Sequence, residues 1–170
     1  MKYNKLFIVA LVALLLDQLT KWIIIQQIPY GSYYPSDPNV VPVWDSIFYL
    51  VHIGNKGAAW GMFSDYSFIF LFLPPLALFG IFYFREALGL YLPIMQVIFG
   101  LFVGGIIGNY VDRIVHGHVI DFLDLHFPLT LPILGDRWPA FNIADSAICI
   151  GAGLYIYASF FLLEEPIQED

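Results

Sequence analysis

The sequence contains little charge, since only 12% of its 170 residues are Asp, Glu, Lys or Arg. In contrast, 59% are hydrophobic and 18% are aromatic, and the mean hydropathy is +0.75. A soluble domain of this size has too little interior to cover so much apolar surface. The composition therefore excludes an ordinary soluble protein and predicts one integral membrane domain over residues 1–170.

Cysteine and positive charge are also scarce. Cys149 is the only cysteine, so no disulfide can form within the chain, and its apolar surroundings indicate a packed or lipid-facing thiol. Seven Lys and Arg stand against fourteen Asp and Glu, which gives a net charge of −7. This balance argues against nucleic acid as a partner, because nucleic-acid binding depends on positive charge.

Apolar stretches predict four transmembrane helices, at about residues 6–28, 67–84, 88–111 and 143–163. The segments between them, 29–66 and 112–141, are predicted to be outer loops. Within the first loop, the β-branched and aromatic run at 47–53 predicts a short strand. We therefore expect an all-α membrane protein with four transmembrane helices and a small extracytoplasmic β-rich element.

The first predicted helix carries two charges on one face. Asp17 and Lys21 are four residues apart, so they share that face, which must turn toward protein. One interpretation is an intrahelical ion pair that lowers the cost of both charges, and the other is a role in supporting a site. Near the end of the third predicted helix, Gly104 and Gly108 have the small-xxx-small spacing that lets another helix approach closely.

Asp121 and Asp145 lie beside apolar segments, on the same membrane face in the four-helix arrangement. Two carboxylates about 4 Å apart, at an effective dielectric near 20, repel by about 4 kcal/mol. That repulsion is enough to hold one of them protonated near neutral pH. The ionised member can take a proton from water, and the neutral member can donate one to a scissile carbonyl oxygen.

Asp145 also has a structural interpretation. Asn142 is a predicted helix N-cap, and Asp145 follows it by three residues, as in a capping box that complements the helix dipole. If Asp145 lies at a helix N-terminus, its anion is favoured, which makes Asp121 the proton carrier of the pair.

The motifs occur in a characteristic order along the chain: DQLTK at 17–21, NKGAAWG at 55–61, GNYVDR at 108–113, VIDF at 119–122 and FNIADS at 141–146. This set resembles the bacterial lipoprotein signal peptidases, the signal peptidase II family. Members of that family are intramembrane aspartic endopeptidases that use no metal or other cofactor. They cut diacylglyceryl-modified prolipoproteins just before the lipidated cysteine, at the outer face of the inner membrane.

The resemblance implies specific roles for residues of this chain. The catalytic pair falls on Asp121 and Asp145. The other motif positions are matched by Asp17, Lys21, Asn55, Gly108, Asn109, Asp112, Arg113, Asn142 and Ala144. Among these, the amide side chains and Arg113 suit the tasks of holding substrate backbone and orienting the pair. The expected partners are prolipoprotein substrates and membrane lipids, and the protein is expected to act as a monomer.

Two other functions remain as alternatives. A metal-dependent membrane hydrolase would use a histidine-rich set of ligands: His116, His118, Asp121, Asp124 and His126. A small membrane transporter or scaffold would explain carboxylates within the membrane as ion relays. The interval 123–140 is rich in aromatic residues and proline, and the sequence assigns it no role.

Overall fold

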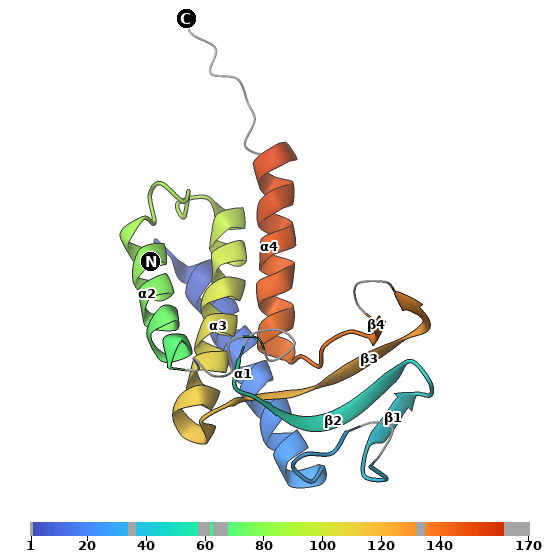
Figure 1. Cartoon of the computed structure of the whole chain (residues 1–170). Coiled ribbons are helices and arrows are strands. Elements are labelled where there is room, and N and C mark those ends of the chain that lie inside the picture. The colour runs from blue at the N-terminus through green and yellow to red at the C-terminus, as the bar shows by residue number, and fades with distance from the viewer. Residues whose placement is uncertain (1, 34–36, 58–61, 63–67, 132–134, 162–170) are drawn as a thin grey trace, which may run out of the picture.

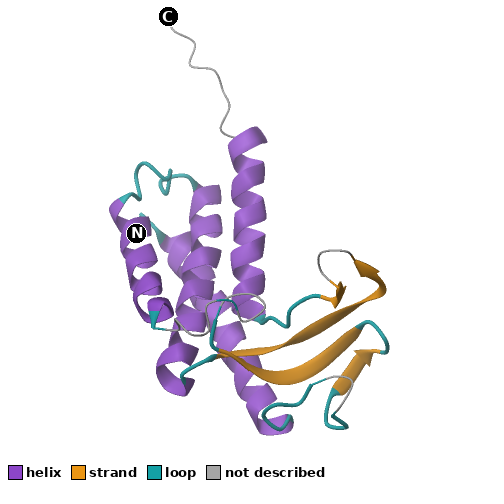
Figure 2. Cartoon of the chain, in the orientation of Figure 1, coloured by secondary structure: helices purple, strands orange, loops and turns teal. Residues whose placement is uncertain are grey.

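The computed structural model describes residues 2–33, 37–57, 62, 68–131 and 135–161. The helices are α1 (Asn4–Gln27), α2 (Ile69–Tyr83), α3 (Pro93–His116) and α4 (Ile143–Phe161). The strands β1 (Val41–Trp44), β2 (Phe48–Asn55), β3 (Val119–Leu131) and β4 (Gly135–Arg137) form one antiparallel sheet in that order. The helices form a bundle, and the sheet lies across one end of it (Figures 1 and 2).

Among the described residues, three helices are long and apolar enough to cross a membrane: α1, α3 and α4. The predicted span at 67–84 is described from residue 68 on, as the fifteen-residue apolar helix α2. The prediction of membrane-spanning helices is therefore confirmed for three helices, and the fourth span stays a prediction.

Two boundaries predicted from the sequence are wrong. The third helix begins at Pro93 rather than at 88, because Gly89 takes a φ of +68° in a turn and Pro93 occupies the first helical turn. It also continues past 111 to His116, where Gly117 ends it at a φ of +76°. Asp112 and Arg113, which were placed in the outer loop, are therefore helical.

The predicted loop 112–141 contains β3, a strand of thirteen residues that the sequence did not reveal. Its polar residues, such as Asp121 and Asp124, interrupt the apolar run by which a strand is recognised. The strand predicted at 47–53 is confirmed as β2 and pairs with β3, with Ile53 opposite Asp121. This pairing places Asp121 beside the end of β2.

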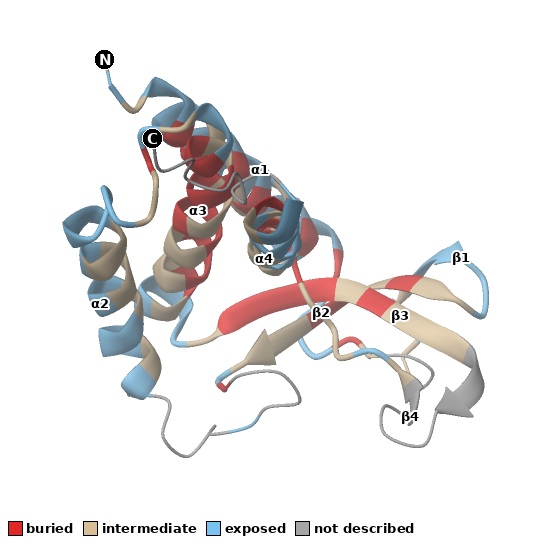
Figure 3. Cartoon of the chain, turned by 90° about the horizontal axis from the view of Figure 1, so that it is seen from above, coloured by how far each residue is buried: buried red, intermediate tan, exposed pale blue. Residues whose placement is uncertain are grey.

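Helix α1 turns large apolar side chains outward and small or charged ones inward. Its buried positions recur every three or four residues: Leu6, Ala10, Ala13, Asp17, Lys21 and Ile24. Its exposed face consists of large apolar side chains, including Phe7, Leu11 and Leu15. Figure 3 shows buried residues along α1 and α3 and at the start of β3. Such a distribution suits a helix whose outer face meets lipid.

Glycines bring α3 close to α1. A Cβ atom on Gly104 would lie 2.7 Å from the Ala10 carbonyl oxygen and 2.7 Å from the Ala13 Cβ. A Cβ atom on Gly108 would lie 2.5 Å from the Asp17 carboxyl oxygen Oδ2. The close helix approach predicted from the Gly104–Gly108 spacing is confirmed, and it allows Asp17 to reach the interior of the bundle.

An apolar cluster fixes the sheet against the helices. Ile24 and Ile28, at the end of α1, pack with Ile120 and Phe122 from the start of β3. Ile120 and Phe122 flank Asp121, and side chains alternate between the two faces of a strand. The cluster therefore holds one face of β3 on α1 and turns Asp121 to the other face.

Candidate active site

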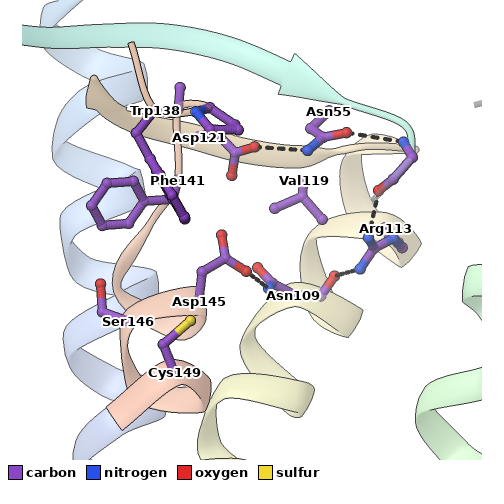
Figure 4. A pocket seen from close by; sticks show the side chains of 13 residues that line it. Asn55, Asn109, Arg113, Val119, Asp121, Trp138, Phe141, Asp145, Ser146 and Cys149 are labelled. Atoms are coloured by element: carbon purple, nitrogen blue, oxygen red, sulfur yellow. Dashed lines mark hydrogen bonds between the residues drawn. The ribbon is translucent and has the colours of Figure 1, made fainter. Parts of the chain in front are cut away.

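A pocket of about 440 Å³ lies where α3 and α4 meet the strands β2 and β3 (Figure 4). Its charged and amide-bearing lining residues are Asn55, Asn109, Arg113, Asp121 and Asp145. These residues come from four separate elements of the chain. All five were singled out from the sequence, and the fold brings them together.

Asp121 and Asp145 face one another across this pocket (Figure 4). Asp121 comes from β3, and Asp145 from the first turn of α4. Asn142 connects the two residues, because its Nδ2 donates to Asp121 Oδ1 at 2.8 Å and its Oδ1 accepts from the Asp145 backbone N–H at 2.9 Å. One amide side chain therefore sets the position of both acidic residues.

The predicted capping box is confirmed. The backbone N–H of Asn142 donates to Asp145 Oδ2 at 3.2 Å, which completes the reciprocal pair of hydrogen bonds. The other carboxyl oxygen, Asp145 Oδ1, accepts from Asn109 Nδ2 at 2.7 Å, and the carboxyl group as a whole points into the pocket (Figure 4). Asp145 thus has a structural role at the helix N-terminus and also presents an oxygen to the pocket.

Asp121 is nearly enclosed, with 2% of its surface exposed. Its Oδ2 accepts a hydrogen bond from Asn55 Nδ2 at 3.0 Å. Burial, and next to it the negative charge of Asp145, raise the pKa of Asp121 to about 7. This side chain can therefore carry a proton at neutral pH, which an exposed aspartate cannot do.

Behind the pocket lies a fully buried group of charges. The Lys21 ammonium group lies 2.8 Å from a carboxyl oxygen of Asp17 and 2.8 Å from one of Asp112. Asp17 Oδ1 also accepts from the backbone N–H of Ala144 at 2.9 Å, at the start of α4. The ion pair predicted within the first helix is confirmed, and it also anchors the helix that carries Asp145.

Asp112 links this charged group to β3. Its Oδ2 accepts from the backbone N–H of Ile120 at 3.0 Å, one residue before Asp121. Its Oδ1 accepts from Gln18 Nε2 at 3.0 Å, and the same amide donates to the Gly108 carbonyl at 3.2 Å. Gln18 was not singled out as a site residue, although it lies within the DQLTK motif.

Arg113 forms one side of the pocket and joins it to the segment after β2. Its Nη1 donates to the Asn109 carbonyl and its Nη2 to the Gly57 carbonyl, each at 3.3 Å. The guanidinium group lies 5.0 Å from the centre of the Phe70 ring on α2. The buried Nε has no hydrogen-bond partner among the described residues. The residues 58–61 of the NKGAAWG motif lie outside the described residues.

The apolar wall of the pocket was missed from the sequence. It is formed by Val119, Trp138, Phe141 and Cys149, with Pro139 and Ala140. Trp138 and its neighbours come from the end of the interval that had no assigned role. Cys149 is exposed rather than packed, and it lines the pocket one helical turn after Asp145, a position that was not predicted. That spacing of four residues was a usable signal.

The histidine-rich set does not form a metal site. The described part of the chain contains no group of three or more His, Cys, Asp or Glu side chains that could hold a metal ion. His126 is instead paired with Asp124, at 2.9 Å, and the ring of His118 lies against Tyr30. The metal-dependent alternative therefore gains no support from the geometry.

The fold and the site define a multi-pass membrane protein with two acidic side chains in one pocket. The family model of signal peptidase (SPase) II matches residues 9–161. The lipoprotein signal peptidase of Nitratidesulfovibrio vulgaris is 39% identical, over 94% of this chain and 92% of the relative. That of Halalkalibacterium halodurans is 36% identical, over 87% and 86%.

Two solved structures have a fold similar to that of this chain. One bacterial membrane enzyme superposes with a TM-score of 0.81 at 29% identity, covering 98% of this chain and 94% of the other. A second superposes with a TM-score of 0.76 at 31% identity. The chain belongs to the signal peptidase II family. The resemblance inferred from the sequence motifs is confirmed, and the protein is a protease of lipoprotein processing.

Proposed function

We propose that this protein is an aspartic endopeptidase that removes the signal peptide from diacylglyceryl-modified prolipoproteins. It cuts the peptide bond just before the lipidated cysteine, with Asp121 and Asp145 as the catalytic pair. The observation that carries the proposal is the meeting of these two acidic side chains in one pocket, joined through Asn142. Membership of the family supports the class of substrate.

The reaction needs one ionised and one protonated carboxyl group. Asp121, with a pKa of about 7, carries the proton, and Asp145 is the carboxylate. Asp145 takes a proton from water while the water oxygen attacks the scissile carbonyl carbon, and Asp121 donates its proton to the carbonyl oxygen. Collapse of this tetrahedral intermediate breaks the C–N bond. The departing amine takes the proton held by Asp145, and the hydroxyl proton returns to Asp121.

The rest of the pocket suits a lipidated peptide. Val119, Trp138 and Phe141 offer an apolar wall for acyl chains and the apolar signal peptide. Arg113 and Asn55 place N–H donors on the side of the pocket away from Trp138 and Phe141, where the backbone carbonyls of an extended peptide can accept hydrogen bonds.

The arrangement of the helices supports a fourth span and an orientation. The start of α1 and the end of α4 lie at the end of the bundle away from the sheet, and α1, α2, α3 and α4 alternate in direction (Figure 1). With α2 as the fourth span, Lys2 and Lys5 lie at the cytoplasmic side. The sheet and the pocket then lie at the outer face of the bacterial inner membrane, where a monomer has all the residues of the site.

The test is cleavage of a purified diacylglyceryl-modified precursor, followed by the shift of its band on a gel. The parent protein should yield the shortened product, whereas Asp121→Asn and Asp145→Asn should each lose at least about a thousandfold in rate. A matched precursor with an unmodified cysteine should remain intact, because the lipid is part of what the pocket recognises.

Asp124→Asn is the matched control. Asp124 is buried on the same strand as Asp121, but it pairs with His126 and does not line the pocket. This variant should cleave within a few-fold of the parent rate. The proposal is wrong if either pocket variant stays active, and a loss of activity in Asp124→Asn would favour the metal-dependent alternative.

A further inference from the structure

Lys21 makes one contact that charge compensation does not require. Its side chain is 2% exposed, and its ammonium group has three N–H donors. Two of them meet the carboxyl oxygens of Asp17 and Asp112, at 2.8 Å each. The third meets a neutral amide oxygen, Asn109 Oδ1, at 3.1 Å. The two carboxylates already offset the charge of Lys21, and the third N–H donor of this buried group also needs an acceptor, which Asn109 provides. The remaining question is what this contact does for Asn109.

The Asn109 amide has a definite direction. Its Oδ1 accepts from Lys21 and also from Asn142 Nδ2 at 3.1 Å, while its Nδ2 donates to Asp145 Oδ1 at 2.7 Å. If the amide turned by half a rotation, its NH₂ group would meet two donors and its oxygen would meet a carboxyl oxygen. Of the two donors to Oδ1, Lys21 alone is charged, and charged donors form hydrogen bonds roughly twice as strong as neutral ones.

The direction of the Asn109 amide determines whether its NH₂ group or its oxygen contacts the Asp145 carboxyl group. Asn109 donates to Asp145 Oδ1, and the backbone N–H of Asn142 donates to Asp145 Oδ2. Because both contacts are donated to the carboxyl group, they suit an ionised carboxylate rather than a protonated one. A turned Asn109 amide would instead offer an oxygen, with which only a protonated Asp145 could form a hydrogen bond.

We propose that Lys21 is a positioning residue, whose ammonium group holds the Asn109 amide so that Nδ2 faces Asp145 and keeps that side chain the proton acceptor of the pair. The proposal rests on the function proposed above. It assigns Lys21, on α1, an effect on catalysis through Asn109 without contact between Lys21 and the substrate.

The competing explanation is that Lys21 only neutralises buried carboxylates. A pair of substitutions that leaves the net charge unchanged separates this explanation from the positioning role. Asp17, Asp112 and Lys21 together carry one net negative charge. Asp112→Asn combined with Lys21→Met leaves Asp17 alone, which is also one negative charge. The reference is the parent protein, because the two then carry the same net charge in this group. The control is Asp112→Asn by itself, which keeps Lys21 and shows how much of any loss comes from residue 112.

The measurement is kcat, KM and the pH profile of precursor cleavage for the parent, the double variant and Asp112→Asn, with thermal unfolding as a check of folding. The titratable groups around Lys21 are Asp17 on α1 and Asp112 on α3, with Asp145 on α4 and Asp121 on β3 beyond Asn109. Relative to the reference, the double variant should lose about tenfold in kcat, about 1.4 kcal/mol, with KM within about twofold. The acid side of its activity profile should move to higher pH.

Equal kcat values and equal pH profiles in the folded double variant and its reference would overturn the proposal. If the double variant does not fold, Asp17→Asn with Lys21→Met is compared with the parent in the same way, with Asp17→Asn as its control. Failure of both double variants to fold, while their controls fold, would assign Lys21 to stability alone and also overturn it. An inactive parent protein would instead overturn the proposed function, so the two failures are distinguishable.

Discussion

At the scale of the residue, the environment of Asp121 converts an ordinary carboxylic acid into a proton carrier. Burial and the charge of Asp145 raise its pKa from 3.8 to about 7. The sequence predicted both acidic residues and the repulsion between them. It could not predict the burial of Asp121 on a strand, because that strand was read as a loop.

The pKa of Asp121 predicts how the cleavage rate changes with pH. In the proposed mechanism Asp121 must be protonated to donate to the carbonyl oxygen, and its protonated fraction falls about tenfold per pH unit above about 7. We therefore expect kcat/KM to fall with that slope between about pH 7.5 and 9. The profile should be measured with the detergent and the precursor held constant. A rate that still rises at pH 9 would be incompatible with Asp121 as the acid.

At the scale of the element, close contact between α1 and α3 positions the charged group behind the pocket. The glycine spacing on α3 was readable from the sequence, because the need for small residues at a helix contact is local. The wall formed by Trp138, Phe141 and Cys149 was not predicted, since it depends on how the residues after β4 run back along β3 to the start of α4. Strand β3 was likewise not predicted, because its polar residues, among them Asp121 and Asp124, disrupt the apolar pattern.

Gly104→Ala should destabilise the protein by about 1–3 kcal/mol, because the new Cβ would meet the backbone of α1. Gly153→Ala is the matched control, since a Cβ there meets nothing within 4 Å. It should be neutral, or stabilising by about 0.5–1 kcal/mol through helix propensity. Thermal unfolding of both variants in detergent provides the comparison. Equal stabilities would mean that the glycine is not needed for the approach of α1 to α3.

At the scale of the whole molecule, the helices place the sheet and the pocket at one end and the start of α1 at the other (Figure 1). The sequence predicted this division, because alternating apolar and polar segments determine which parts share a side. It could not predict that the two outer segments pair into a single sheet, since that pairing joins β2 to β3 across two helices.

The orientation proposed above predicts which surface positions a membrane-impermeant thiol reagent can reach. Asn39 is exposed near the sheet, and Glu86 is exposed in the turn after α2. In a Cys149→Ser background, Asn39→Cys should react in spheroplasts, and Glu86→Cys should react only after the membrane is opened. The reverse pattern would place the pocket on the cytoplasmic side.

The central claim is that Asp121 and Asp145 act as one unit, and their combined substitution tests it most directly. If the two side chains share one proton-transfer task, the double variant Asp121→Asn with Asp145→Asn should cleave the precursor at about the rate of the less active single variant. The single-turnover rates of the four proteins give this comparison. If instead the rate of the double variant is reduced by the product of the two single reductions, the result would contradict a shared catalytic pair.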